Sequence, residues 1–400
     1  MKFKKRAAVA LGAAIGVCCG AMFSACRGGD SYDEQVDESK AQLYVMNYDG
    51  GFGTDWLRDV KNRFEAQNAD KEYLPGKKGV QILIDATKTQ GTGLNLPSSA
   101  SEVFFTEIVP YFDFASSGQL LDVSDVVNEV LAQDGVSMSD SQKNALTALD
   151  GKYYALPHYE GFGGVIYNKS VFRDYALYFD DEGDFTDDET QFSAGPDGEK
   201  GTSDDGLPAT YKQFLQLCEQ IGLTKEVTPF VLSGQYKDSY VLYFLDAIAT
   251  AYNGNEISKA SYTFGGKIKY VTQVEENPNA AFGYGLQLAE ENLTEAKGYL
   301  TKQTAGKFYA LALLKDLIST GCFDSDSLAD TVSHLDAQET FLTSELKNKP
   351  IAMLIDGSWW ENEAKDAFAR AVNLYGEENA SKYNRDFGWM PLPCKADDTD

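Results

Sequence analysis

The sequence predicts an α/β protein with two domains. Three short apolar segments, at residues 43–48, 80–84 and 103–105, have the composition of strands, and a helical pattern lies between the first two. Strand, helix and strand at this spacing predict a largely parallel sheet, with ligands bound beyond the carboxyl ends of its strands. After residue 157 helical patterns dominate, and a chain of 400 residues is long enough for a second core.

The helix of the first domain follows the glycine-rich turn at residues 49–53, and we expect Thr54 to cap it. Its spacing places four apolar side chains on one face: Trp56, Leu57, Val60 and Phe64. The second domain has helical periodicity at residues 211–221, 238–252, 305–319 and 336–344. Gly265-Gly266, inside the apolar stretch 262–270, predicts a tight β-hairpin there.

The first 26 residues have the pattern of an export signal. A cationic start is followed by an apolar run at residues 7–23 and by Ser24-Ala25-Cys26, which resembles the lipobox of bacterial lipoproteins. We therefore expect a signal peptide at residues 1–25, an acylated Cys26, and a flexible tether at residues 26–40. The protein would be lipid-anchored on the extracytoplasmic face of the cell membrane. Plain secretion, with Cys26 unmodified, is the alternative.

Charge and cysteine content exclude several classes of protein. A formal net charge of −26 disfavours nucleic acid and anionic lipid surfaces as partners. Behind the leader only Cys26, Cys218, Cys322 and Cys394 remain, and their wide spacing argues against a disulfide framework. The sequence contains no CxxC or Cys/His cluster, so zinc and haem chemistry are not expected. Cys218 falls on the apolar stripe of a predicted helix, where a buried thiol fills space.

An acidic, glycine-rich segment at residues 180–208 interrupts the second domain. Clustered carboxylates on a bendable backbone are suitable ligands for Ca²⁺, and Asp197, Asp204 and Asp205 are the candidate ligands. The spacing does not match an EF-hand, and a solvated acidic loop is the favoured interpretation. We expect no other cofactor.

Three separated motifs carry a resemblance to a known family. They are residues 150–157 followed by Val165-Ile166-Tyr167-Asn168-Lys169, residues 337–341 leading into Asp356-Gly357-Ser358-Trp359-Trp360, and Phe387-Gly388-Trp389-Met390-Pro391. In this order they resemble the extracellular solute-binding proteins of bacterial ABC sugar importers (family 1), the group that includes maltose-binding protein. The resemblance implies a two-lobed, periplasmic-binding-protein-like fold of type II with a hinge that closes on a sugar. It also implies no catalysis, and ABC permease subunits as partners of a monomeric receptor.

The resemblance places lobe 1 at residues 41–157 and lobe 2 at residues 158–400, with a first hinge strand through residues 155–164. Family members continue past the third motif and return to lobe 1. We therefore expect either that the C-terminal part of the fold is missing from this sequence or that its end has diverged.

Site residues follow from the resemblance and from position. The resemblance makes Trp359 the tryptophan that stacks on a sugar ring, Tyr236 a second stacking aromatic residue, and Glu160 an acidic sugar ligand. Trp360 either packs into the lobe or joins the site. Five more candidates follow predicted strands, namely Asn47, Tyr48, Asp49, Thr106 and Glu107. For these five, and for Glu160 and Tyr236, turn chemistry, packing or solvated charge is an equal alternative. His158 is expected to pack or to form hydrogen bonds at the hinge rather than to act as a base.

These observations predict a receptor that captures a carbohydrate, an oligosaccharide in particular, and delivers it to an ABC importer. An aromatic plate that covers a sugar face, with polar groups on the ring edge, is the chemistry such a site needs. Two alternatives stay open. A lipid-anchored glycoside hydrolase would need two opposed carboxylates, and a receptor for a peptide or polyamine could use the same fold.

Overall fold

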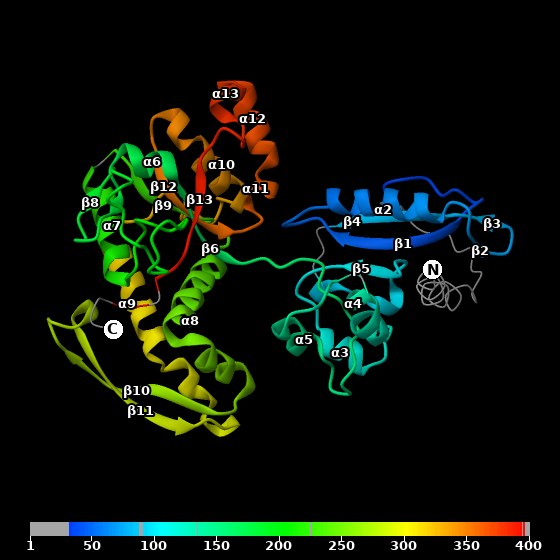
Figure 1. Ribbon diagram of the computed structural model, residues 1–400, viewed down its shortest axis with the longest axis horizontal. Helices are drawn as coiled ribbons and strands as arrows, with labels where there is room; N and C mark the ends of the chain where they lie inside the picture. The colour runs from blue at the N-terminus through cyan, green and yellow to red at the C-terminus, as the bar shows by residue number, and fades with distance from the viewer. Residues whose placement is uncertain (1–31, 88–90, 134, 225, 394, 397–400) are drawn as a thin grey trace. The chain divides into compact units, whose positions relative to one another are not determined.

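The computed structural model describes residues 32–87, 91–133, 135–224, 226–393 and 395–396. The predicted signal peptide, Cys26 and Cys394 lie outside these residues. The chain divides into two compact units, unit 1 up to Glu160 and unit 2 from Gly161, and each is drawn in Figure 1. In the part of the chain that the structure describes, no helix has the length and apolar character needed to cross a membrane.

Unit 1 is built on a three-stranded parallel sheet in the order β4-β1-β5. The strands are β1 (Ala41–Tyr48), β4 (Val80–Thr87) and β5 (Val103–Phe105), so all three predicted strands and their parallel pairing are confirmed. Helix α2 (Asp55–Asn68) lies along one face of the sheet in Figure 1. Leu57 of α2 packs there against Val45 and Ile84 in a small core.

The start of α2 differs from the sequence prediction in two ways. Thr54 occupies the N-cap position, but its side chain makes no capping hydrogen bond; it donates instead to Asp49 Oδ1 at 2.7 Å. Val60 is 38 % exposed and does not belong to the buried face. Lys61 is buried in its place, because its ammonium group pairs with Asp33 and Glu34 at 3.4 and 2.9 Å.

Residues 32–40 are part of the folded unit, not of a free tether. The Asp33 backbone N–H donates to the Ile84 carbonyl at 3.0 Å, and the Ile84 N–H donates to Asp33 Oδ1 at 2.9 Å. The Asp37 N–H donates to Gln81 Oε1 at 2.7 Å. The segment therefore lies alongside β4 and is hydrogen-bonded to it. The polar composition of residues 27–40 did not predict this contact.

The rest of unit 1 consists of short elements. They are β2 (Glu72–Leu74), β3 (Lys77–Lys78), η1 (Gly91–Gly93), η2 (Leu96–Ser98), α3 (Tyr111–Ser116), η3 (Val126–Val130), α4 (Leu131–Gln133) and α5 (Asp140–Leu146). Ser139 and Gln142 form a capping box at the start of α5.

Unit 2 contains a mixed four-stranded sheet in the order β13-β6-β12-β9. The strands are β6 (Gly163–Asn168), β9 (Thr228–Val231), β12 (Ile351–Gly357) and β13 (Phe387–Met390). Strand β6 runs antiparallel to both of its neighbours, whereas β9 is parallel to β12. The carboxyl ends of β9, β12 and β13 therefore share one edge of the sheet with the amino end of β6. We call this edge the unit 2 edge.

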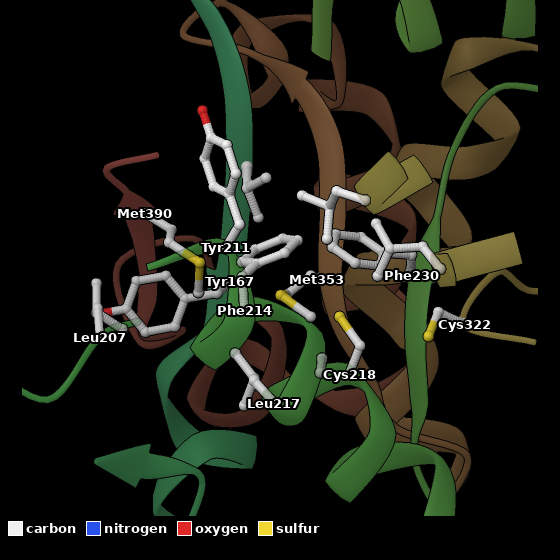
Figure 2. Close-up of a cluster of buried hydrophobic side chains, with 14 of the residues drawn as sticks. Tyr167, Leu207, Tyr211, Phe214, Leu217, Cys218, Phe230, Cys322, Met353 and Met390 are labelled. Carbon is white, nitrogen blue, oxygen red and sulfur yellow. The ribbon is translucent and has the colours of Figure 1, made fainter. Parts of the chain in front are cut away.

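Helices cover both faces of this sheet. They are α6 (Lys169–Asp174), α7 (Tyr211–Thr224), α8 (Lys237–Thr263), α9 (Ala305–Ser319), α10 (His334–Ser344), α11 (Trp360–Glu363), α12 (Lys365–Tyr375) and α13 (Glu377–Ala380), with η4 (Ala281–Gly283), η5 (Glu295–Lys302) and η6 (Glu345–Lys347) between them. Successive strand residues face opposite cores. Met353 packs in the larger core with α7 and α9, which Figure 2 shows in part, and Leu354 packs with α10 and α12 in the smaller one.

The predicted hairpin at residues 262–270 is wrong in its position. Helix α8 continues to Thr263, and Phe264, at φ +51°, ends it in the left-handed region. Gly265-Gly266 is therefore a helix stop rather than a hairpin turn. A hairpin lies further along the chain, where β10 (Lys267–Glu276) pairs with β11 (Tyr284–Asn292). A smaller hairpin pairs β7 (Tyr178–Phe179) with β8 (Phe185–Thr186).

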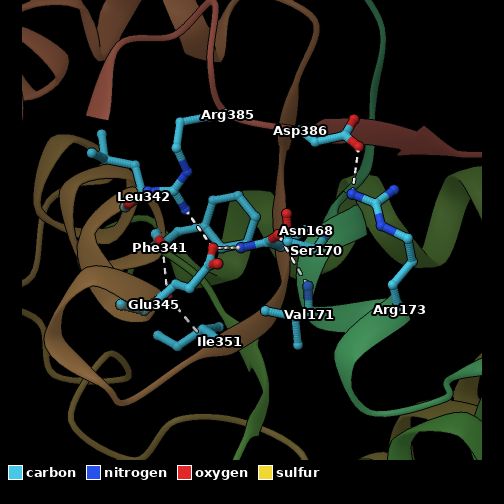
Figure 3. A network of polar contacts seen from close by, with 11 residues as sticks. Asn168, Ser170, Val171, Arg173, Phe341, Leu342, Glu345, Ile351, Arg385 and Asp386 are labelled. Carbon is cyan, nitrogen blue, oxygen red and sulfur yellow. Dashed lines mark hydrogen bonds and ion pairs between the residues drawn. The ribbon is translucent and has the colours of Figure 1, made fainter. Parts of the chain in front are cut away.

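The Tyr167-Asn168-Lys169 motif has a structural role in unit 2, shown in Figure 3. Asn168 Oδ1 accepts hydrogen bonds from the N–H groups of Ser170 and Val171 and so caps α6. Its Nδ2 donates to Glu345 Oε2 at 2.9 Å, and Arg385 donates to the same oxygen at 2.9 Å. The motif thus ties β6 to the segments around α10 and β13, at the end of β6 away from the unit 2 edge.

Candidate functional site

A pocket of about 290 Å³ extends from the unit 2 edge along β6 and β13. Aromatic side chains dominate its lining, which consists of Phe162, Ile166, Ser358, Trp360, Glu361, Phe387, Gly388 and Trp389. Phe162 is 59 % exposed, and its ring meets that of Trp389 edge-on with 5.3 Å between centroids. The Ser358 hydroxyl accepts from the Phe162 N–H at 3.3 Å. The pocket therefore offers aromatic surfaces beside hydroxyl and carboxylate groups.

Trp359 and Trp360 have different environments although they are neighbours. Trp360 is buried and packs against the rings of Phe341, Phe368 and Phe387, so its predicted packing into the lobe is confirmed. It also lines the pocket, and its role in ligand binding stays a prediction. Trp359 is only half-buried. Its indole lies directly on Gly357, since a Cβ built there would lie 2.3 Å from the ring atoms of Trp359.

Trp389 has the same relation to a second glycine. A Cβ on Gly164 would lie 2.5 Å from Cζ2 of the Trp389 indole. Both indoles therefore rest on backbone that only a glycine leaves open. Each glycine therefore leaves the space that one tryptophan ring occupies at the unit 2 edge.

A buried polar cluster lies beneath Gly357. Asp356 is 3 % exposed, and its carboxylate accepts from the Gly357 N–H at 2.7 Å and from Gln338 Nε2 at 2.9 Å. Gln338 Nε2 also donates to Glu363 Oε2 at 3.0 Å. Burial raises the pKa of Asp356 to about 7, and the charge of Glu363 acts in the same direction.

The cluster connects Trp359 with Tyr236. The His334 imidazole lies 4.0 Å from Glu363 Oε2, and the Tyr236 ring lies 5.8 Å from that of His334. Tyr236 is 45 % exposed at the start of α8. The buried Gln338 Oε1 has no hydrogen-bond partner among the described residues. The structure thus brings the two predicted aromatic residues of unit 2 to one edge.

The carboxyl ends of β4, β1 and β5 form the corresponding edge of unit 1, which we call the unit 1 edge. Asn47 is 2 % exposed; its amide donates to the Gly53 carbonyl at 3.2 Å and to Thr54 Oγ1 at 3.0 Å. Asp49 accepts from the Thr54 hydroxyl. The Tyr48 ring lies against Gly50, where a Cβ would be 2.4 Å away. Asn47 and Asp49 are thus engaged in holding the turn.

Thr106 and Glu107 follow β5 at the unit 1 edge. The Thr106 hydroxyl donates to the Glu107 carbonyl at 3.3 Å, and the Glu107 carboxylate accepts from the Tyr159 hydroxyl. Burial, the bond to Glu107 and its charge raise the pKa of Tyr159. The Tyr159 ring lies 4.6 Å from that of Phe52.

His158 and Glu160 lie in the same segment as Tyr159. The His158 ring packs against Trp56 and Phe105 at 5.6 and 5.3 Å, and burial lowers the pKa of His158, so it has the packing contacts expected of it. Glu160 is exposed and accepts from Gln142 Nε2 at 2.7 Å, next to α5. The hydrogen bond of Glu160 is thus to α5, whereas Tyr159 is the residue of this segment that contacts Phe52, which follows β1.

Sequence reasoning missed Phe162, Gln338, Asp356 and Trp389 as site residues. All but Phe162 stand inside the motifs quoted for the family resemblance. Trp389 also falls near the end of a strand, which was a usable signal. The contact between Gln338 and Asp356 depends on how α10 packs on β12, and no local pattern shows that.

In the acidic segment, carboxylates accept hydrogen bonds from other residues of the same segment. Asp204 is 4 % exposed; it accepts from the Asp197 N–H at 3.0 Å and from the Thr202 hydroxyl at 2.6 Å. Asp205 accepts from the Gly201 N–H at 2.7 Å. Within the described ranges, no three His, Cys, Asp or Glu side chains are grouped so that they could hold a metal ion. Calcium binding by Asp197, Asp204 and Asp205 stays a prediction.

A two-unit α/β chain with an aromatic pocket beside a sheet edge is compatible with a binding protein. Residues 53–400 match the family model of the bacterial extracellular solute-binding proteins, and the chain belongs to that family. Its members bind solutes and are not enzymes. A comparison with curated proteins finds no significant match.

Two solved structures have similar folds. One is described as "SBP RafE in complex with raffinose", with a TM-score of 0.51, 16 % identity, and coverage of 89 % of this chain and 69 % of that one. The other is a probable secreted solute-binding lipoprotein from Streptomyces coelicolor, with a TM-score of 0.50, 13 % identity, and coverage of 89 % and 68 %. At such identities the similarity shows the fold, and the two-lobed α/β class predicted from the sequence is confirmed.

Proposed function

We propose that this protein captures a carbohydrate, an oligosaccharide in particular, and delivers it to the permease subunits of an ABC importer. The observation that carries the proposal is the pocket at the unit 2 edge, where Phe162 and Trp389 present ring surfaces beside Ser358 and the Glu361 carboxylate. Half-buried Trp359 lies between Ser358 and Trp360 in the chain, and both of these neighbours line the pocket. A pyranose has apolar C–H faces and hydroxyls on its edge. Aromatic rings with a few fixed polar groups match both.

Two further points support a sugar as the solute. The family binds solutes outside the cell, and one protein of similar fold is described in complex with raffinose. Membership in a family of binding proteins removes the glycoside hydrolase alternative. Ligand contacts by Tyr48 and Glu107 of unit 1 are also part of the proposal and are tested with variants of unit 1 alone.

A thermal-shift screen of the full chain tests the solute class. The probes are raffinose, maltotriose and diacetylchitobiose against spermidine and a tripeptide. A ligand at a hundredfold excess over its Kd stabilises the folded state by about 2.7 kcal/mol, which corresponds to roughly 5–10 °C. Stabilisation by a saccharide alone supports the proposal. Stabilisation by spermidine or the peptide alone contradicts it and favours the non-sugar receptor.

We also propose that Cys26 carries the lipid anchor, which keeps the receptor at high effective concentration beside its importer. In a bacterial expression host, labelled fatty acid should be incorporated into the wild-type protein. The variant Cys26→Ala should incorporate none and should not remain in the membrane fraction. Equal labelling of both proteins would contradict the anchor.

A further inference from the structure

Two thiols from distant parts of the chain meet in the larger core of unit 2. Cys218 lies on the buried face of α7 and is 0 % exposed, and Cys322, which follows α9, is 2 % exposed. Both are free thiols in this structure and belong to the same core, where the interaction between them raises the pKa of Cys218 and lowers that of Cys322. Figure 2 shows both in one cluster with Phe230.

Regular backbone contacts fix the position of each cysteine. The Cys322 N–H donates to the Leu317 carbonyl at 3.0 Å and so closes the end of α9. The Cys322 carbonyl accepts from the Phe230 N–H of β9 at 3.0 Å. Cys218 lies in the middle of a fourteen-residue helix. The contact between the thiols is thus set by the packing of α7 against β9 and the end of α9, and not by a flexible loop.

The surroundings make the two thiols unequal. The Thr320 hydroxyl lies 3.0 Å from Cys322 Sγ. Hydrogen bonds from Cys218 and Thr320 lower the pKa of Cys322, whereas burial raises that of Cys218. Cys218 lies within α7, whereas Cys322 lies in the turn that follows α9. Gly321, its neighbour, is exposed, so a small opening of this turn brings Cys322 to solvent.

We propose that Cys218 and Cys322 form a disulfide bond when the protein meets an oxidising exterior, and that this bond fastens α7 to the segment that follows α9. Proteins that fold outside the cytoplasm keep such bonds, and the family is extracellular. The two cysteines occupy positions whose wide sequence spacing argued against a disulfide. The fold removes that argument because it places both cysteines in one core.

The bond forms by exchange with an external disulfide, such as oxidised glutathione or a disulfide oxidoreductase. The Cys322 thiolate attacks one sulfur of that disulfide and releases one external thiol, which leaves a mixed disulfide on Cys322. Cys218 then gives up its proton and attacks Cys322 Sγ, releasing the second external thiol. Two electrons pass from the protein thiols to the external disulfide, which is reduced to two thiols.

The bond closes a loop of about 100 residues, so it restricts the unfolded chain strongly. We expect the oxidised protein to melt roughly 10 °C above the reduced protein. The bond would lie in the core that also contains Phe230 of β9 and Met353 of β12.

The test uses the full chain, unfolded and refolded with a mixture of reduced and oxidised glutathione. Remaining thiols are then blocked and peptides are mapped without reduction. The expected result is a cross-linked pair of peptides that contain Cys218 and Cys322, lost after dithiothreitol, together with the higher melting temperature. Cys394→Ser is the matched control, and it should keep both the cross-link and the shift.

Two results would overturn the proposal. One is a natively folded protein, judged by circular dichroism, in which both thiols are blocked as free cysteines after glutathione treatment. The other is a cross-link that joins Cys322 or Cys218 to Cys394 or Cys26 instead. Because the mapping is done on the wild-type chain, it does not depend on whether Cys218→Ser or Cys322→Ser folds.

Discussion

The unit 1 edge and the unit 2 edge occupy equivalent places on their sheets but use their side chains differently. At the unit 1 edge, Asn47 and Asp49 are both hydrogen-bonded to Thr54, and Glu107 is hydrogen-bonded to Tyr159. These bonds connect the loops of that edge. At the unit 2 edge the hydrogen bonds are buried below Gly357, and aromatic rings lie above them. Polar residues after a strand thus build the edge in one unit and support an apolar surface in the other.

This contrast indicates where ligand affinity arises. A half-buried indole gives up little hydration when a sugar covers it, whereas a carboxylate that already accepts a hydrogen bond must exchange a partner. We therefore expect substitutions at the unit 2 edge to affect carbohydrate affinity more than substitutions at the unit 1 edge.

The largest expected effect follows from removal of Trp359. Trp359→Ala should weaken binding of the saccharide found in the thermal-shift screen by roughly thirtyfold, about 2 kcal/mol, the loss typical of a buried aromatic contact. Isothermal titration calorimetry measures it. Leu374→Ala is the matched control, since Leu374 is 76 % exposed on α12 and should leave the affinity unchanged. Equal affinities of Trp359→Ala and wild type would refute the role of Trp359.

Gly357→Ala should produce the next largest effect. The new methyl group collides with the Trp359 ring, which can rotate away, so affinity should fall about tenfold while stability changes little. Gly164→Ala displaces Trp389 in the same way. Comparison of the two variants by calorimetry tells which indole covers the sugar. If both variants bind the saccharide with wild-type affinity, the positions of the Trp359 and Trp389 rings do not determine that affinity.

A smaller effect concerns the dependence of stability on pH. The pKa of Asp356 is raised from 3.8 to about 7 in the folded protein, so the folded state binds the proton more tightly than the unfolded state. Its contribution is fully present below pH 3.8 and is lost as the pH rises to 7. Urea unfolding should show the stability of the wild type, relative to Asp356→Asn, falling over this range by on the order of 1–4 kcal/mol.

Asp356→Asn keeps an acceptor for the Gly357 N–H, and Gln338 can turn its amide to meet the new side chain. The groups that face Asp356 are Gln338 and Glu363, with the Tyr240 ring near by. A constant difference between the two proteins from pH 4 to pH 7 would mean that Asp356 is ionised throughout.

The smallest effect on affinity is expected at the unit 1 edge. Glu107→Gln keeps an acceptor for the Tyr159 hydroxyl but removes the charge. Affinity for the saccharide should change less than threefold, and the free energy of unfolding by about 1 kcal/mol. A loss in calorimetry as large as that of Trp359→Ala would reverse the ranking of the two edges.

The sequence predicted elements whose periodicity matches local packing. Strands β1, β4 and β5 and helix α9 were found in their places, because their apolar residues face one core. Val60 and the hairpin at residues 262–270 were misplaced. Lys61 took the buried position through ion pairs with residues 28 and 27 positions earlier in the chain, and Gly265-Gly266 serves a helix end as well as it would serve a turn.

The candidate site was predictable only where a motif carried it. Trp359 follows from its place after a strand, but its position on Gly357 and the cluster of Asp356, Gln338 and Glu363 depend on the packing of α10 and α11 against β12. The contact between Cys218 and Cys322 likewise depends on tertiary packing, which no spacing rule could have predicted.

The chain has four tryptophans, one in unit 1 and three in unit 2, and ¹⁹F NMR of protein labelled with 5-fluorotryptophan observes each separately. The resonances are assigned with single Trp→Phe variants, and the saccharide from the screen is then added to saturation. We predict that the Trp359 and Trp389 resonances shift, while that of buried Trp360 and that of Trp56 change little. Saturation that moves only Trp56, or none of the four, would contradict carbohydrate binding at the unit 2 edge.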